Sequence, residues 1–258
     1  MTGNQQYGLK VDVSSGGSFD GNTISDNSIT NSTAGLIYII APNATVDGNT
    51  ISQNTLTGTP TKNAIWIHAD VSASRNAIQD NVLTGNAGGI RFTGALFGPP
   101  GENIFARNDA SNSATAGFMI LNTSSNIISA NTIVGSSTGI LLLDADRNLI
   151  SGNTISSDSD TLRIFSSINN IITGNALSGQ GSNNGISLND QSNDNTVFNN
   201  NFSNNGTHIS VSANSTGNVF GIDKPVGGNW YDTYDVQAEG CSDSSPADSF
   251  CDAPFVFT

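Results

Sequence analysis

Residues 126–133 read Asn-Ile-Ile-Ser-Ala-Asn-Thr-Ile, residues 148–155 read Asn-Leu-Ile-Ser-Gly-Asn-Thr-Ile, and residues 170–177 read Asn-Ile-Ile-Thr-Gly-Asn-Ala-Leu. Each stretch carries two asparagines five positions apart, and an apolar residue follows two positions after each asparagine. Self-similarity at a fixed period indicates a repeat architecture. One unit is therefore written N-x-I-x-x-N-x-I, followed by a variable loop and then G-I-x-I.

The same unit extends over most of the 258-residue chain. The first asparagine recurs at spacings of 27, 23, 22, 22 and 25 residues. Two earlier units keep only the second asparagine, which we assign to Asn22 and Asn49, and a ninth unit begins at Asn218. The six complete units begin at Asn76, Asn103, Asn126, Asn148, Asn170 and Asn195.

Apolar residues alternate with polar residues within each unit, which predicts short strands rather than helices. A single unit cannot bury its apolar side alone, so successive units must stack. We therefore predict an all-β chain, a single-stranded parallel β-helix of about eight to nine coils. Equivalent asparagines then lie above one another at the bends, where asparagine tolerates left-handed backbone conformations.

The chain divides into coils over residues 1–222, with an N-terminal end that looks open or truncated, and a capping segment over residues 223–258. We expect Cys241 and Cys251 to form a disulfide in that segment, closing a loop of about 11 residues, although two free thiols are the alternative. The aromatic residues that suit a C-terminal cap are Trp230, Tyr231, Tyr234, Phe250, Phe255 and Phe257.

The repeated units over residues 17–222 resemble the right-handed parallel β-helix superfamily. That superfamily includes polysaccharide lyases, epimerases and hydrolases, phage tailspikes, surface proteins and NosD-like periplasmic proteins. The stretch 228–234, Gly-Asn-Trp-Tyr-Asp-Thr-Tyr, with Asp-Ala-Pro-Phe at 252–255, resembles the closing segment of NosD-like and archaeal surface β-helices. Such relatives often carry a calcium-type loop here, but residues 241–252 lack its glycines and alternating aspartates. We predict no metal or cofactor, with calcium binding as an alternative that the sequence leaves open but does not predict.

The charge of the chain restricts its partners. Acidic residues outnumber basic ones by 21 to 8, for a formal net charge of −13. Such a chain repels phosphate backbones and anionic lipid surfaces, so nucleic acid is not an expected partner. It has no run of 18 apolar residues, so no membrane insertion is expected. The composition and the resemblance favour an extracellular, cell-surface or periplasmic location, although this chain shows no signal peptide.

The outward positions of the third strand of each coil are unusually apolar for a wetted face. We expect them to contact a polysaccharide or surface glycan, with sugar rings on Trp66, or to mediate self-association. The alternative without a functional role is that the long loops of the early coils bury these residues. The predicted contact residues are Trp66, Ile37, Arg91, Met119, Leu141, Arg163 and Phe165.

His68, Arg91 and Asp70 are the candidate catalytic residues on this face. Lyases and epimerases that act on uronates need a base for the proton beside the carboxylate and a cation for the enolate. His68 and Arg91 lie on adjacent coils, roughly 5–7 Å apart by strand spacing, and Asp70 is placed to orient His68. A solvated surface histidine is the plainer alternative.

We therefore expect an extracellular or cell-surface β-helix domain that interacts with polysaccharide, with lyase, epimerase or hydrolase activity implied only by the resemblance. The alternative is a non-catalytic structural or adhesive surface or tail-fibre protein. A NosD-like periplasmic factor and an ice-binding protein are weaker alternatives. Ice binding would depend on a flat Thr/Ser array formed by Thr23, Ser25, Thr50, Ser52, Thr132, Thr154 and Ser156.

Overall fold

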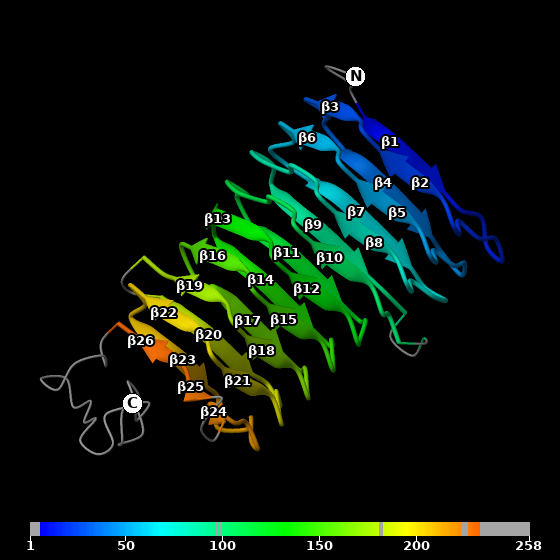
Figure 1. The fold of residues 1–258 in the computed structure, drawn as a ribbon. Helices are drawn as coiled ribbons and strands as arrows, with labels where there is room; N and C mark the ends of the chain where they lie inside the picture. The colour runs from blue at the N-terminus through cyan, green and yellow to red at the C-terminus, as the bar shows by residue number, and fades with distance from the viewer. Residues whose placement is uncertain (1–5, 96–97, 99, 181–182, 223–226, 233–258) are drawn as a thin grey trace, which may run out of the picture.

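The computed structural model describes residues 6–95, 98, 100–180, 183–222 and 227–232. Within these residues all regular secondary structure is β, and strands from successive turns lie side by side in long parallel sheets (Figure 1). The fold is a right-handed parallel β-helix of about nine turns, which confirms the prediction. No helix in the described part of the chain is long and apolar enough to cross a membrane.

Three parallel sheets run along the solenoid, each taking one strand from successive coils. The largest has nine strands: β1 (Tyr7–Asp12), β4 (Gly35–Ala41), β7 (Asn63–Ala69), β9 (Gly88–Thr93), β11 (Ala116–Leu121), β14 (Thr138–Leu143), β17 (Leu162–Phe165), β20 (Asn184–Asn189) and β23 (Thr207–Val211). The second has eight: β2 (Thr23–Ser25), β5 (Thr50–Ser52), β8 (Ala77–Gln79), β10 (Ile104–Ala106), β12 (Ile127–Ser129), β15 (Leu149–Ser151), β18 (Ile171–Thr173) and β21 (Thr196–Phe198).

The third sheet is shorter and less regular. Its five strands are β13 (Thr132–Ser136), β16 (Thr154–Ser157), β19 (Ala176–Ser178), β22 (Asn201–Ser203) and β26 (Trp230–Tyr231). Single β-bridges through Val82 and Asp109 connect it to the parallel pair β3 (Ser28–Thr30) and β6 (Thr55–Thr57). An antiparallel pair, β24 (Gly221–Ile222) and β25 (Gly227–Gly228), lies at the C-terminal end (Figure 1).

Two asparagine ladders hold the corners that flank β8, β10 and their equivalents. Asn153 Oδ1, for example, accepts the backbone N–H of Asn131 at 2.9 Å and its side-chain amide at 2.9 Å. The first ladder is Asn22, Asn49, Asn76, Asn103, Asn126, Asn148, Asn170, Asn195 and Asn218. The second ladder is Asn27, Asn54, Asn81, Asn108, Asn131, Asn153, Asn175, Asn200 and Asn229.

The residue before each ladder asparagine, from Asn22 to Asn218 along the chain, has a left-handed backbone. Its φ is +54° at Ala130 and +63° at Gly152, for example. Every coil thus turns at two sharp corners, and the asparagine beyond each corner, buried from Asn49 to Asn200, satisfies the backbone groups that the turn leaves unpaired.

These ladders correct the register of the first two coils. Asn22 and Asn49 belong to the first ladder, not to the second. Ile24 and Ile51 accordingly stack on Ile78. The first two coils contain an additional turn, residues 14–20 and 42–47, whose apolar residues have the same spacing as those of a strand. Because of that similarity, the sequence pattern predicts a register for the first two coils that is wrong by one strand.

The core is a set of stacked apolar columns. Ile78, Phe105 and Ile128 succeed one another in the eight-stranded sheet, and all three are fully buried. In the nine-stranded sheet, Ile90, Phe118 and Ile140 form an equivalent buried column. Burying such side chains stabilises each coil only in the presence of its neighbours, as a solenoid requires.

The structure does not support a continuous Thr/Ser array. Thr23, Ser25, Thr50 and Ser52 lie in the eight-stranded sheet, whereas Thr132, Thr154 and Ser156 lie in the five-stranded sheet. The two groups therefore face different sides of the solenoid. The sequence pattern predicts one array because it places the first two coils one strand out of register. The structure separates these residues onto two faces, so they do not form the flat array that ice binding requires.

Aromatic side chains pack together at the described C-terminal end. Tyr231 is buried, and its ring stacks on Phe202 with centroids 5.2 Å apart. His208 packs against both rings, at 5.9 Å from Phe202 and 5.2 Å from Tyr231. The other predicted cap residues, Tyr234, Phe250, Phe255, Phe257, and the predicted disulfide between Cys241 and Cys251 lie outside the described residues.

Candidate functional site

The outer face of the nine-stranded sheet presents two columns of side chains. Parallel pairing in register places equivalent residues of successive coils next to one another. The first column is Lys10, Tyr38, Trp66, Arg91, Met119, Leu141, Arg163, Ser187 and Ser210. The second column is Asp12, Ile40, His68, Thr93, Leu121, Leu143, Phe165 and Asn189.

Ile37 was wrongly predicted as an outward contact residue. It pairs with Ile65, it is 0 % exposed, and it belongs to the core. The outward residue of that coil is Tyr38, which pairs with Trp66. Strand β4 is apolar at almost every position, so alternation in the sequence does not show which side of it faces inward.

Aromatic rings stack along the N-terminal part of the first column. Tyr7 and Tyr38 are stacked with ring centroids 4.7 Å apart, and Trp66 meets Tyr38 in an edge-to-face arrangement at 5.0 Å. The guanidinium carbon of Arg91 lies 4.8 Å from the centre of the Trp66 ring. Burial raises the pKa of Tyr38, so its hydroxyl stays protonated at neutral pH. The column is therefore a packed ladder that offers ring edges and a cation to the solvent.

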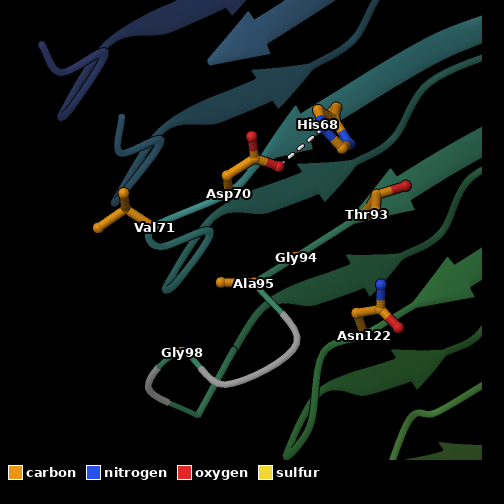
Figure 2. Close-up of a pocket in the computed structure, with 8 residues that line it drawn as sticks. All are labelled: His68, Asp70, Val71, Thr93, Gly94, Ala95, Gly98 and Asn122. Atoms are coloured by element: carbon orange, nitrogen blue, oxygen red, sulfur yellow. Dashed lines mark ion pairs between the residues drawn. The ribbon is translucent and has the colours of Figure 1, made fainter. Parts of the chain in front are cut away.

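A pocket of about 340 Å³ opens beside this ladder, between the ends of β7, β9 and β11 and the segment that follows β9 (Figure 2). His68 and Asp70 form one wall, and Nε2 of His68 lies 2.9 Å from Oδ1 of Asp70. Thr93, which pairs with His68 on the adjacent strand, and Asn122 also line the pocket. The remaining lining residues are small or apolar: Val71, Gly94, Ala95 and Gly98.

The structure brings three of the predicted site residues together. His68 and Asp70 share the pocket, and Arg91 is on the adjacent coil. The register places Thr93, not Arg91, directly opposite His68, so Arg91 lies diagonally from it. A base held by a carboxylate, a nearby cation and hydroxyl and amide groups can bind a sugar and can move a proton.

Met119, Leu141 and Phe165 continue the same face beyond Arg91, and all three are half-buried. Their side chains are thus neither fully buried under loops nor fully exposed to solvent. Arg163, two coils beyond Met119, lies 3.9 Å from Asp160 through its Nε atom. Along the solenoid, this face thus presents the aromatic ladder, then the pocket, and then an apolar part made of Met119, Leu141 and Phe165.

Sequence reasoning missed the role of Tyr38, Thr93 and Asn122 in this site. Tyr38 was missed because alternation in the sequence does not determine which side of β4 faces outward. Asn122 is one of the non-glycine residues with a left-handed backbone, at φ +52°. The sequence signal for Asn122 is its place directly after the apolar run 116–121, because a polar residue at such a place ends a strand at a turn.

Solved structures with the same fold support the architecture but not an activity. The A-modules of the mannuronan C-5 epimerases AlgE6 and AlgE4 from Azotobacter vinelandii each match with a TM-score of 0.60 and 15 % identity, covering 76 % and 75 % of this chain. The Dettilon tailspike protein gp208 matches with a TM-score of 0.56 and 15 % identity over 84 % of this chain. This chain spans 58 %, 63 % and 61 % of those three structures. At this identity the similarity shows the fold alone.

No curated protein sequence matches this chain. The family model described as "Right handed beta helix region" matches residues 1–99, and the model described as "Periplasmic copper-binding protein (NosD)" matches residues 62–236. Copper prefers imidazole, thiolate and thioether ligands. Within the described residues, however, no three His, Cys, Asp or Glu side chains gather closely enough to hold a metal ion. The described residues do not fit copper, but the matched length, more than half of the chain, shows that this chain belongs to the NosD family of right-handed β-helix proteins.

Proposed function

We propose that this protein binds polysaccharide on the outer face of its nine-stranded sheet, outside the cell or in the periplasm. The observation that carries the proposal is the pocket of about 340 Å³ beside the aromatic ladder. Ligand sites combine apolar walls with a few placed polar groups in pockets of roughly 300–1,000 Å³. Here His68, Asp70, Thr93 and Asn122 are the polar groups, and Trp66 borders them in the same strand as His68.

The comparisons support this proposal in two ways. Two solved structures with the same fold are modules of mannuronan C-5 epimerases, and a third is a tailspike protein. The family description supports a periplasmic location.

A second candidate function is proton abstraction from a uronate, as in a polysaccharide lyase or epimerase. The observation that favours it is the His68–Asp70 contact of 2.9 Å, which holds the imidazole in one orientation at the pocket wall. Arg91, one coil away, supplies the nearest cation on this face, and a cation stabilises an enolate. Glycoside hydrolysis is less favoured because it needs two carboxylates about 5–9.5 Å apart, and Asp70 is the one carboxylate among the described pocket residues.

A structural or adhesive role is the remaining alternative. Met119, Leu141 and Phe165 give the face an apolar part that is half-buried, which suits self-association through this sheet. Light scattering over a range of protein concentrations tests this alternative. A dimer that Leu141→Asp converts to a monomer would favour it over glycan binding.

The binding proposal is tested with affinity electrophoresis and calorimetry against a panel of neutral and acidic polysaccharides. Trp66→Ala is expected to weaken binding by at least about tenfold, the value of one well-placed contact. Trp230→Ala is the matched control, because Trp230 is 43 % exposed and lies in the five-stranded sheet. Failure of every polysaccharide to bind, or equal effects of the two substitutions, would contradict the proposal.

Catalysis is measured on the same panel by the ultraviolet absorbance of unsaturated uronates and by exchange of the sugar C5 proton with solvent. His68→Ala should abolish either signal, whereas it should weaken polysaccharide binding only in part, because Trp66 and the other polar groups of the pocket remain. Asp70→Asn should reduce the rate by a smaller factor, since it changes only the partner of the imidazole.

A further inference from the structure

Arg91 is a cation without a carboxylate in an acidic chain. Acidic residues outnumber basic ones by 21 to 8, and several other arginines are ion-paired. Arg107 Nε lies 2.7 Å from Asp80, Arg75 3.7 Å from Asp47, and Arg163 3.9 Å from Asp160. Among the described residues, no carboxylate oxygen lies within 4.0 Å of the guanidinium nitrogens of Arg91.

Three buried polar atoms without a protein partner gather around this position. Nε of Arg91, Nε1 of Trp66 and Oγ1 of Thr93 are each buried, and none makes a hydrogen bond within the described part of the chain. Thr93 is 9 % exposed and lines the pocket. Buried polar groups are nearly always hydrogen-bonded, and leaving one unsatisfied costs about 1–3 kcal/mol.

The register makes these residues neighbours. Trp66 and Arg91 are opposite one another on adjacent strands, and Thr93 follows Arg91 two positions later on the same face. Arg91 and Trp66 can only donate hydrogen bonds, and the threonine hydroxyl can donate one. A group that satisfies all three must therefore accept hydrogen bonds, and an anion does so most strongly beside a guanidinium.

We propose that Arg91, Trp66 and Thr93 form a subsite for an anionic substituent of a bound polysaccharide, a sugar carboxylate or sulfate. This inference rests on the proposed function and specifies its substrate class: the protein selects acidic over neutral glycans. Packing of Arg91 against Trp66 fixes the guanidinium in place before the ligand arrives, which reduces the entropy that binding must overcome.

The net charge of the protein opposes this ligand only at long range. Exposed charges farther apart than about 8 Å are largely screened at physiological ionic strength. The acidic substituent contacts Arg91 at hydrogen-bond distance, where screening is weak. Selectivity for acidic glycans is therefore expected to persist at about 0.15 M salt.

The experiment compares matched pairs of polymers by calorimetry at that ionic strength: polygalacturonate with its carboxyl-reduced form, and dextran sulfate with dextran. The wild-type protein is expected to bind at least one acidic polymer about 10- to 100-fold more tightly than its neutral partner, the value of one charge-assisted hydrogen-bonded contact. The acidic partner that binds identifies the substituent as a carboxylate or a sulfate.

Three variants assign the selectivity to this subsite. Arg91→Gln should remove most of the acidic preference. Arg107→Gln, at an arginine that is ion-paired to Asp80 and lies outside the nine-stranded sheet, should leave it unchanged. Trp66→Phe retains an aromatic ring without the indole N–H and should weaken acidic binding by a smaller factor. Circular dichroism and thermal melts of each variant confirm that the fold is retained.

The outcomes separate the two proposals. If acidic and neutral partners bind equally well, the anion subsite is wrong and polysaccharide binding stands. If no polymer of either kind binds, and the panel described above also fails, polysaccharide binding is wrong and the subsite falls with it. Equal loss of the acidic preference in Arg91→Gln and Arg107→Gln would overturn the assignment to Arg91.

Discussion

The guanidinium carbon of Arg91 lies 4.8 Å from the centre of the indole ring of Trp66, on the adjacent coil. The contact joins two adjacent coils on the outside of the solenoid, where the buried core does not hold the side chains together. It also determines where the cation of the proposed site is held. The same pair of residues is therefore expected to affect both the stability of the fold and the selectivity for ligands. Substitutions can separate the two effects.

Arg91→Met retains an apolar side chain over Trp66 but removes the charge. We expect a loss of about 0.5–1 kcal/mol in the free energy of unfolding, the usual value of a partly exposed cation–π contact. A double-mutant cycle with Trp66→Leu, followed by urea denaturation, measures the coupling directly. A coupling energy of zero would show that the two side chains do not interact.

Asn153→Ala should be strongly destabilising. Asn153 is 1 % exposed, its Oδ1 accepts two hydrogen bonds from Asn131, and its amide donates to the carbonyl of Ile128 at 2.9 Å. Removing it leaves several buried groups unpaired, for a loss of about 3 kcal/mol or more. Asn201→Ala is the matched control, because the Asn201 side chain points outward and is exposed; its change should stay within about 0.5 kcal/mol.

Gly117→Ala tests how closely the coils approach inside the solenoid. A Cβ atom at Gly117 would collide with Cγ2 of Ile133 and lie 2.9 Å from the carbonyl oxygen of Gly139. We expect a loss of about 2–3 kcal/mol from overpacking. At Gly152 a Cβ has no neighbour closer than 4.0 Å, and only the left-handed φ of +63° opposes it. Gly152→Ala should therefore cost about 1 kcal/mol, and the reverse order in denaturation midpoints would contradict this account.

The C-terminal end should lose stability on acidification. Burial lowers the pKa of His208 below its ordinary value of 6.5, although the charge of Asp232, 3.4 Å away, opposes the shift. The unfolded chain therefore takes up a proton at a higher pH than the folded chain does. The free energy of unfolding falls as pH decreases through 6.5 towards the lowered pKa.

Urea denaturation between pH 7.5 and pH 5 measures this effect. His208→Gln should flatten the pH dependence over that window, because glutamine does not titrate. The acidic residues that titrate below this window act equally in both proteins, so the difference between them isolates His208. An identical slope in the two proteins would exclude His208 as the source.

The fold was predictable because the N-x-I-x-x-N-x-I unit shows both the two-residue alternation of a strand and the asparagines that the corners need. A buried asparagine that follows a left-handed residue is needed at each corner, so the spacing between asparagines reports the coil length. The register of the first two coils was not predictable in the same way. Phe19 and Val46 lie in turns with strand-like spacing, and only the stacking of Asn22 on Asn49 and Asn76 distinguishes them.

The site was predictable in part. His68, Asp70, Trp66 and Arg91 are polar or aromatic residues that interrupt the outward positions of apolar strands, and the structure places them together. The pocket itself was not predictable, because the sequence after Thr93 departs from the repeat and so gives no register for the residues that line it. Ile37 and Tyr38 were exchanged because every neighbouring position in β4 is apolar.

The most direct test of the central claim is hydrogen–deuterium exchange of the whole protein with and without saturating oligogalacturonate. Ligand on the outer face should slow exchange in residues 63–70 and 88–95, which carry Trp66, His68 and Arg91, and leave the eight-stranded sheet unchanged. Protection confined to another sheet, or no protection at a concentration that saturates binding in calorimetry, would contradict the account.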